Sequence, residues 1–165
     1  MPETEDLTGL RNEARSFRDS FSSLVLATCS AEGVPDASYA PFILDESENP
    51  CLFISRLARH TQNLLANPSA SALFIEDESS ARNLFGRRRL TLQCNALEVP
   101  RESGPGLTLL DQFEARFGKT AALLRTLGDF HLFRLEVVSG SYVRGFAQAY
   151  DLTGASLDIA RPPNA

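Results

Sequence analysis

Residues 52–64 bring together the side chains whose types and spacing are best suited to binding an anion. An apolar run at residues 52–54 leads directly into the expected start of a short helix, which carries Ser55, Arg56, Arg59, His60 and Thr61. A helix N-terminus offers free backbone N–H groups and the positive end of its dipole, and the arginines add cationic charge. The pattern predicts a binding site for the phosphate or carboxylate of a small cofactor.

Nearby charges support a second interpretation, in which these cations only form surface or subunit-interface ion pairs. An acidic run at residues 76–78 and a basic run at residues 87–89 follow closely. Exposed pairs of this kind are common and contribute only about 0–1 kcal/mol each. Composition leaves both interpretations open, and the order of the motifs along the chain favours the ligand site.

The composition of the chain limits its class. It has 165 residues, of which 43% are hydrophobic, and a formal net charge of −5, which predicts one domain over residues 1–165 with its own core. The acidic balance argues against nucleic acid as a partner, because such modules are usually basic. The first twenty residues are charged and contain no apolar segment, so we expect a cytoplasmic protein without a membrane partner.

The cysteines predict neither a disulfide framework nor a metal site. Cys29, Cys51 and Cys94 are odd in number and lie in expected strands, which suits small buried side chains in a reducing compartment. No C-x-x-C or other metal-ligand spacing occurs in the sequence.

Hydrophobic periodicity indicates strands joined in hairpins, with helices at the periphery. Apolar residues at helical spacing predict an amphipathic helix over about residues 5–20. Strands are expected at residues 24–29, 34–43, 52–54, 70–76, 87–99 and in a final hairpin over 130–146 that turns at Ser139-Gly140. A short helical connection is predicted at residues 79–85, and two short helices are predicted over residues 107–127. Residues 153–165 form a weakly patterned tail that we expect to be mobile. Strands without regular helix alternation predict a closed Greek-key barrel.

Several motifs, read in order, closely resemble the haem-utilisation (HugZ-type) family of the FMN-binding split-barrel superfamily, which also contains pyridoxamine 5′-phosphate oxidase. They are SRLARHTQNL at 55–64, NP at 67–68, IED at 75–77, ARNLF at 81–85 and RRRLT at 87–91, with LAT at 26–28, PDASYAPF at 35–42, GDFHLFRL at 128–135 and YVRGFAQAY at 142–150. The resemblance covers nearly the whole chain. It implies a mainly β (α+β) fold, a six-stranded antiparallel Greek-key split β-barrel with peripheral helices.

The resemblance also implies a cofactor, which is haem or FMN, in a cleft of a homodimer, together with an unidentified electron donor. In the flavin-binding relatives the FMN phosphate is held by a basic residue on the second strand and by an Arg-Lys pair after the third. Arg59 and His60 match the pair, but the second strand has Ser38 and Tyr39 near the position of the basic residue. Serine cannot reproduce the bidentate phosphate contacts of arginine, so haem is the preferred cofactor and FMN the alternative.

For haem, the resemblance implies a histidine on the C-terminal tail as axial ligand, assisted by an acidic residue of the other subunit. Asp129 matches the acidic position, whereas residues 158–165 contain no His, Cys, Met or Tyr. His60 and His131 are therefore the remaining candidates for the iron. His60 suits a ligand or anion contact as well as a structural role, and His131, between apolar neighbours on a strand, is more typical of a structural histidine.

Two further residues complete the candidate site. Tyr39 can stack on a planar ligand or close the barrel core, and the core is the favoured interpretation. Arg89, in the basic run, is a candidate ligand or subunit contact. No catalytic residue is assigned. The expected function is haem binding with oxidative degradation and iron release, an oxidoreductase activity. The alternatives are an FMN-dependent oxidoreductase, a non-enzymatic haem-binding or storage module, and a barrel that binds none of these.

Overall fold

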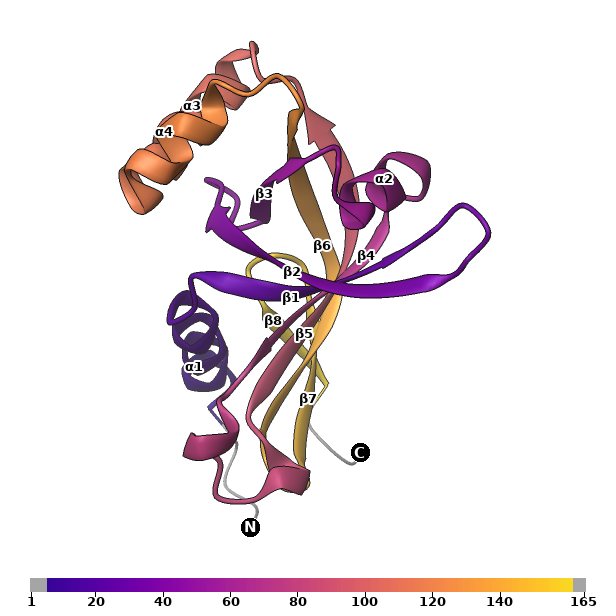
Figure 1. Cartoon of the computed structure of the whole chain (residues 1–165). Coiled ribbons are helices and arrows are strands. Elements are labelled where there is room, and N and C mark those ends of the chain that lie inside the picture. Colours follow the sequence, from indigo (N-terminus) through magenta and orange to yellow (C-terminus); the bar gives the residue numbers. More distant parts are fainter. Residues whose placement is uncertain (1–5, 162–165) are drawn as a thin grey trace.

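The computed structural model describes residues 6–161, which fold around one antiparallel sheet (Figure 1). Its eight strands in this range are β1 (Ser23–Cys29), β2 (Pro35–Leu44), β3 (Pro50–Ser55), β4 (Ser69–Ile75), β5 (Arg89–Val99), β6 (Phe130–Gly145), β7 (Gln148–Thr153) and β8 (Asp158–Arg161). They lie in the order β3-β2-β1-β4-β5-β6-β7-β8, and a further pairing of β3 with β6 closes a six-stranded barrel. The predicted mainly β barrel with peripheral helices is confirmed.

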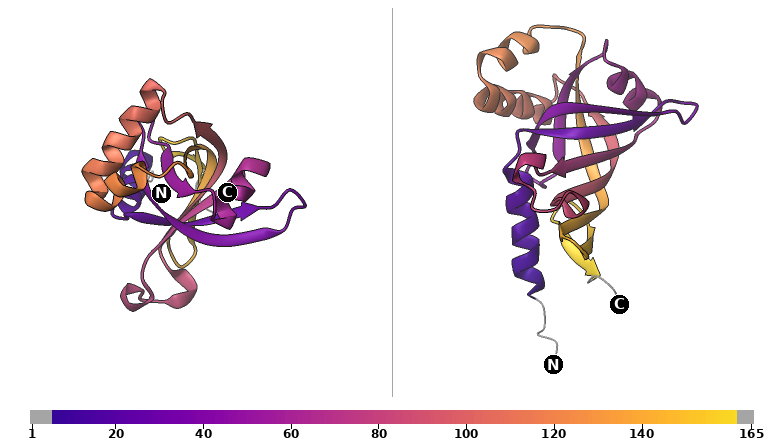
Figure 2. Two further views of the ribbon diagram at one scale, coloured as in Figure 1. Left: turned by 45° about the horizontal axis from the view of Figure 1, so that its top comes forward. Right: turned by 60° about the horizontal axis from the view of Figure 1, so that its bottom comes forward.

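Helices flank this sheet. Within residues 6–161 they are α1 (Leu7–Asp19), α2 (Arg59–Ala66), α3 (Gly104–Phe117) and α4 (Lys119–Arg125), with the short 3-10 helices η1 (Glu78–Ser80) and η2 (Leu84–Gly86). Figures 1 and 2 show α3 and α4 at one end of the molecule and α1 towards the other. None of the helices in the described range is long and apolar enough to cross a membrane.

Two apolar clusters hold the fold, and β3 takes part in both. Leu52 faces the barrel interior, where Leu26 and Leu92 are also 0% exposed. Phe53 faces the other way and packs under α3 against Phe113. Because both faces of β3 are covered, every residue of the strand except the last is buried. This packing gives Ser55, the last residue of β3, a fixed position.

The two ends of the described chain lie side by side. Leu10, Ala14 and Phe17 are buried on the inner face of α1, as helical periodicity predicts. Arg11 of α1 forms an ion pair with Asp158 of β8 at 2.9 Å. Residues 153–161, expected to belong to a mobile tail, instead contain the strand β8 paired with β7, and residues 162–165 lie outside the described range.

The predicted turn at Ser139-Gly140 is wrong, because β6 continues through it. A Cβ at Gly140 would lie 2.6 Å from the Thr91 carbonyl oxygen, so glycine is needed where β5 and β6 approach closely. The hairpin turns after Gly145, where Ala147 has a φ of 60°, and continues into β7.

Candidate functional site

The junction between β3 and α2 holds the first group of expected site residues. The Ser55 hydroxyl donates to Oδ2 of Asp129 at 2.6 Å, and the Arg56 backbone N–H donates to the Asp129 carbonyl oxygen at 2.7 Å. This contact exists because β3 pairs with β6, which sets Ser55 opposite Phe130. Barrel closure thus joins residues 74 positions apart in the sequence.

His60 is half-buried in the first turn of α2 and contacts β2. Its Nδ1 lies 2.9 Å from Oγ of Ser38, and that oxygen lies 3.3 Å from the Leu26 carbonyl oxygen on β1. Burial lowers the pKa of His60 below its ordinary value of 6.5, and the Asp36 carboxylate opposes this shift only in part. The imidazole is therefore neutral at pH 7, and Nε2 has no hydrogen-bond partner in the described part of the chain.

The two arginines of the junction are unpaired cations. Arg56 and Arg59 are exposed, and their side chains make no hydrogen bond or ion pair with any described residue. The acidic run at residues 76–78 forms no ion pair with them in the described chain: Glu78 lies 3.6 Å from Arg87, and Glu76 accepts from the Arg88 backbone N–H at 2.8 Å. Surface ion pairs between the acidic run and the junction are therefore not supported within one chain, and ion pairs across a subunit interface stay a prediction.

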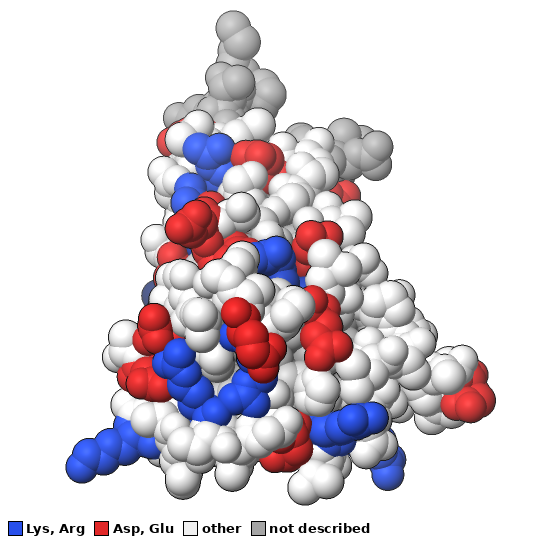
Figure 3. All heavy atoms as spheres, turned by 90° about the horizontal axis from the view of Figure 1, so that it is seen from above, with Lys and Arg blue, Asp and Glu red and all other residues white. Residues whose placement is uncertain are grey.

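The start of α2 adds backbone donors to these cations. Ala58 precedes the helix and provides no side-chain cap, so the first-turn N–H groups have no side-chain acceptor, and that of Thr61 donates to the Ala58 carbonyl oxygen at 3.1 Å. Figure 3 shows basic and acidic side chains interspersed over one end of the molecule, without a broad patch of one sign. On the face drawn there, no extended basic surface is available to attract an anion.

Thr61 is buried beneath α2 and does not line an open wall. Its side chain is 0% exposed, and its Oγ1 has no hydrogen-bond partner among the residues described. One turn along, Asn63 donates to Oγ1 of Thr28 on β1 at 2.9 Å. A side chain without exposed surface cannot meet a ligand from solvent unless the helix moves.

Arg89 and Tyr39 lie apart from the junction within one chain. Arg89 opens β5 and pairs with Ile75, at the end of β4 remote from α2. Its guanidinium donates to the Arg87 carbonyl oxygen at 3.1 Å, and no hydrogen bond joins it to a described residue of the junction. Tyr39 is 71% exposed, so the expectation that it closes the core is wrong. The inward positions of β2 belong to Ser38 and Ala40.

His131 has a partner of its own. Its Nδ1 lies 2.5 Å from Oε1 of Glu98 on β5, and the ring also contacts Phe133 on its own strand. A carboxylate that holds an imidazole in this way satisfies it locally. The geometry agrees with the structural role that its apolar neighbours predict.

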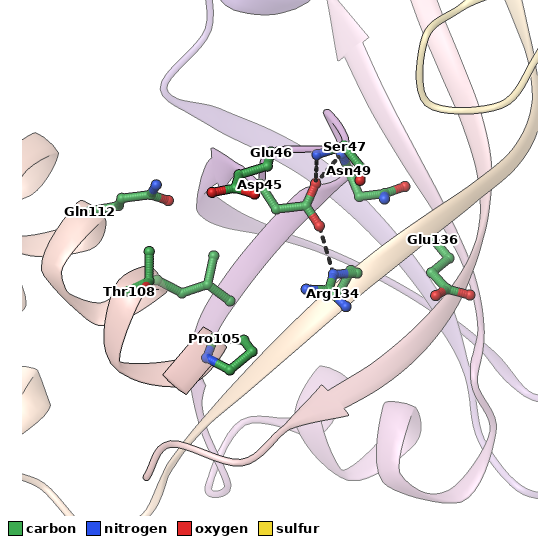
Figure 4. A pocket seen from close by; sticks show the side chains of 10 residues that line it. Asp45, Glu46, Ser47, Asn49, Pro105, Thr108, Gln112, Arg134 and Glu136 are labelled. Atoms are coloured by element: carbon green, nitrogen blue, oxygen red, sulfur yellow. Dashed lines mark hydrogen bonds and ion pairs between the residues drawn. The ribbon is translucent and has the colours of Figure 1, made fainter. Parts of the chain in front are cut away.

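A cavity of about 460 Å³ lies elsewhere, between α3, the turn after β2 and the outer face of β6 (Figure 4). Arg134 donates to Asp45 at 2.6 Å within it, and Glu46 and Glu136 also line it. Three carboxylates against one guanidinium leave a negative excess, which disfavours the propionates of haem and the phosphate of FMN. This cavity is therefore a poor candidate for either cofactor.

Sequence reasoning missed two partners that define the site. Ser38 is noticed there only as the replacement of a basic residue, and Glu98 is not noticed at all. Ser38, Ala40 and Phe42 occupy every second position of β2 and therefore face the same way. This spacing could have predicted that Ser38 points into the barrel. Nothing in the local sequence relates Glu98 to His131, 33 positions away.

Comparison with known proteins gives the family. Residues 10–144 match the family model described as pyridoxamine 5′-phosphate oxidase. The chain is 43% identical over 148 residues to the heme oxygenase HutZ of Vibrio cholerae, covering 90% of this chain and 84% of that one. It is 34% identical over 119 residues to the chloroplastic non-canonical heme oxygenase HOZ of Arabidopsis thaliana, covering 72% of this chain but only 35% of that protein.

Solved structures agree. The crystal structure of HutZ, described as a heme storage protein, superposes with a TM-score of 0.71 at 43% identity, over 75% of this chain and 87% of that one. ChuZ of Campylobacter jejuni superposes with a TM-score of 0.83 at 33% identity, over 95% of this chain and 64% of that one. The chain belongs to the haem-utilisation (HugZ-type) family of pyridoxamine 5′-phosphate oxidase-like split barrels.

Proposed function

We propose that this protein binds haem at the junction of β3 and α2. The observation that carries the proposal is a set of groups without partners in the described chain: the exposed guanidinium groups of Arg56 and Arg59, and Nε2 of His60. Haem presents two carboxylates and an iron that accepts a nitrogen ligand, so it fits this donor set. Relatives named as a heme oxygenase and a heme storage protein support the assignment.

The junction favours haem over FMN. FMN would need its phosphate held from β2 as well as from α2, but the Ser38 hydroxyl is already bonded to His60. A hydroxyl also lacks the charge and the paired donors with which arginine binds phosphate. The match to the pyridoxamine 5′-phosphate oxidase model supports FMN as the second candidate.

We further propose that the bound haem is degraded oxidatively with release of iron, using an electron donor still to be identified. When bound, haem supplies the redox chemistry, which no side chain of the junction can supply. Arg56 and Arg59 would hold its propionates, and Asp129, which accepts from Ser55 at 2.6 Å, would add a fixed carboxylate to the junction. A storage role, in which haem is bound without turnover, is the alternative, and the description of HutZ as a heme storage protein favours it.

The working unit is proposed to be a homodimer in the cytoplasm. Tyr39 and Val25 pair across β1 and β2 and are 71% and 39% exposed, which leaves apolar surface on the outer face of the barrel. Arg89 forms no hydrogen bond with the described residues of the junction in its own chain, and in a two-fold dimer we expect it to lie at the subunit contact. Free thiols at Cys29, Cys51 and Cys94 suit a reducing compartment. Sedimentation at micromolar concentration tests the dimer, and a monomer contradicts it.

Visible absorption during titration with haemin, and separately with FMN, tests the proposed function. A Soret band that saturates at one haem per subunit is expected, followed by loss of that band in air with ascorbate as reductant. A Soret band that persists under reductant and oxygen selects the storage role. Flavin bands that saturate without haem binding overturn the proposal in favour of an FMN oxidoreductase.

A further inference from the structure

The Ser38 hydroxyl lies between two partners whose chemistry determines which way its proton points. Its Oγ is 2.9 Å from Nδ1 of His60 and 3.3 Å from the Leu26 carbonyl oxygen. A carbonyl oxygen can only accept, and a serine hydroxyl has a single proton. When that proton is donated to Leu26, the remaining contact requires Nδ1 of His60 to carry a proton and donate it to Ser38.

We infer that Ser38 is a positioning residue that holds His60 as the Nδ1–H tautomer and leaves the Nε2 lone pair free to ligate a metal. The tautomer is a property of the chain alone, whereas the role of Nε2 as an iron ligand rests on the proposed function. Histidine tautomers at metal sites are set by the hydrogen bond of the other ring nitrogen. Here that bond joins His60 of α2 to Ser38 of β2, 22 positions away in the sequence.

Two features of the surroundings make this arrangement stable. The register of β1 and β2 sets Ser38 opposite Leu26, which fixes the hydroxyl in the barrel wall. Asn63 anchors the next turn of α2 on Thr28 of β1 at 2.9 Å, so the helix cannot easily carry His60 away.

His131 supplies an internal reference. Its Nδ1 faces a Glu98 carboxylate, which only accepts, so His131 is the Nδ1–H form for an unrelated reason. The chain has only two histidines, so a spectrum of the imidazole nitrogens contains just two spin systems. A substitution of Ser38 should change the nitrogen chemical shifts of His60 and leave those of His131 unchanged.

Long-range proton–nitrogen correlation NMR of the uniformly nitrogen-15-labelled protein without haem, near pH 7.5, tests the tautomer. In the unmodified protein, Nδ1 of His60 is expected to be protonated and Nε2 to have the shift of an unprotonated nitrogen. A protonated Nε2 with a bare Nδ1 overturns the inference, and this result requires no variant. Ser38→Ala should shift His60 towards the Nε2–H form that predominates for histidine in water, whereas Ser38→Thr should retain Nδ1–H. If Ser38→Ala keeps the Nδ1–H form with unchanged shifts, Ser38 does not position the ring.

Haemin titration then separates the iron ligand from the tautomer. Ser38→Ala should weaken haemin binding several-fold and Ser38→Thr should restore it, while His60→Gln should change the Soret position. An unaltered Soret spectrum in His60→Gln refutes His60 as the ligand. If haemin fails to bind the unmodified protein, the proposed function fails, and the NMR result still decides the role of Ser38 in the tautomer.

Discussion

Removing the charges of Arg56 and Arg59 should weaken haem binding without weakening the fold. Both side chains are exposed and have no partner among the described residues, so changing each to glutamine should alter the free energy of unfolding by no more than about 0.5 kcal/mol. An exposed ion pair to a propionate contributes roughly 0.5–1 kcal/mol, so losing two costs about 1–2 kcal/mol of binding free energy. That range corresponds to an increase in the haemin Kd of roughly 5- to 30-fold.

The assay is a haemin titration of the double variant at low and high ionic strength, with a melting curve of each protein. Salt screens exposed charges, so the unmodified protein should lose more affinity at high salt than the double variant does. Lys119→Gln is the matched control, because Lys119 is also an exposed cation without a partner in the described chain but lies on α4. An unchanged Kd in the double variant, or an equal loss in the control, refutes the reasoning.

Three further predictions concern buried groups. Tyr142→Phe should lower the free energy of unfolding by about 1–2 kcal/mol in urea titrations, because the buried hydroxyl loses hydrogen bonds of 2.7 and 2.8 Å. Burial is the main cause that raises the pKa of Tyr142 to about 12, so the unfolded chain loses this proton at lower pH than the folded protein does. The free energy of unfolding of the unmodified protein should therefore fall between pH 10 and 12. The Tyr142→Phe variant should lack this part of the fall. Burial raises the pKa of the thiols of Cys51 and Cys94 to about 12, so Ellman's reagent at pH 8 should react quickly with Cys29 alone, and fast reaction of three thiols would contradict this packing. Asp45→Ala should lower the free energy of unfolding, measured by chemical denaturation, by about 2–3 kcal/mol, because this carboxylate is only 9% exposed and accepts hydrogen bonds from two backbone N–H groups and Arg134. A loss below about 0.5 kcal/mol would show that these bonds contribute little.

The sequence predicts the barrel well because the signals for it are local. Alternating burial along β1 and β4 follows the period of two, and the helix at Leu7–Asp19 follows its apolar stripe. The prediction of a turn at Ser139-Gly140 is wrong because a glycine is as typical of a close approach between strands as it is of a turn. Only the register of β5 and β6 distinguishes the two.

The site is harder to predict because its contacts are between distant elements. The family resemblance points to both Ser55 and Asp129, but their hydrogen bond depends on barrel closure, which no local pattern encodes. Tyr39 is misplaced because β2 reverses the usual preference: it turns a serine inward to meet His60 and an aromatic ring outward. Tyr39 is the neighbour of Ser38, so the error falls next to the proposed ligand site.

The pairing of β3 with β6 has a consequence for how the protein is made. When β3 leaves the ribosome, its partner β6 is still about 75 residues from being synthesised, so the backbone N–H and C=O groups on that edge of β3 stay unpaired in the meantime. Closure also joins residues far apart in sequence, which makes it an intrinsically slow step of folding. A nascent chain that stops before Phe130 would hold an open sheet, whose exposed edge invites pairing with other chains. The barrel can therefore close only once β6 has been synthesised.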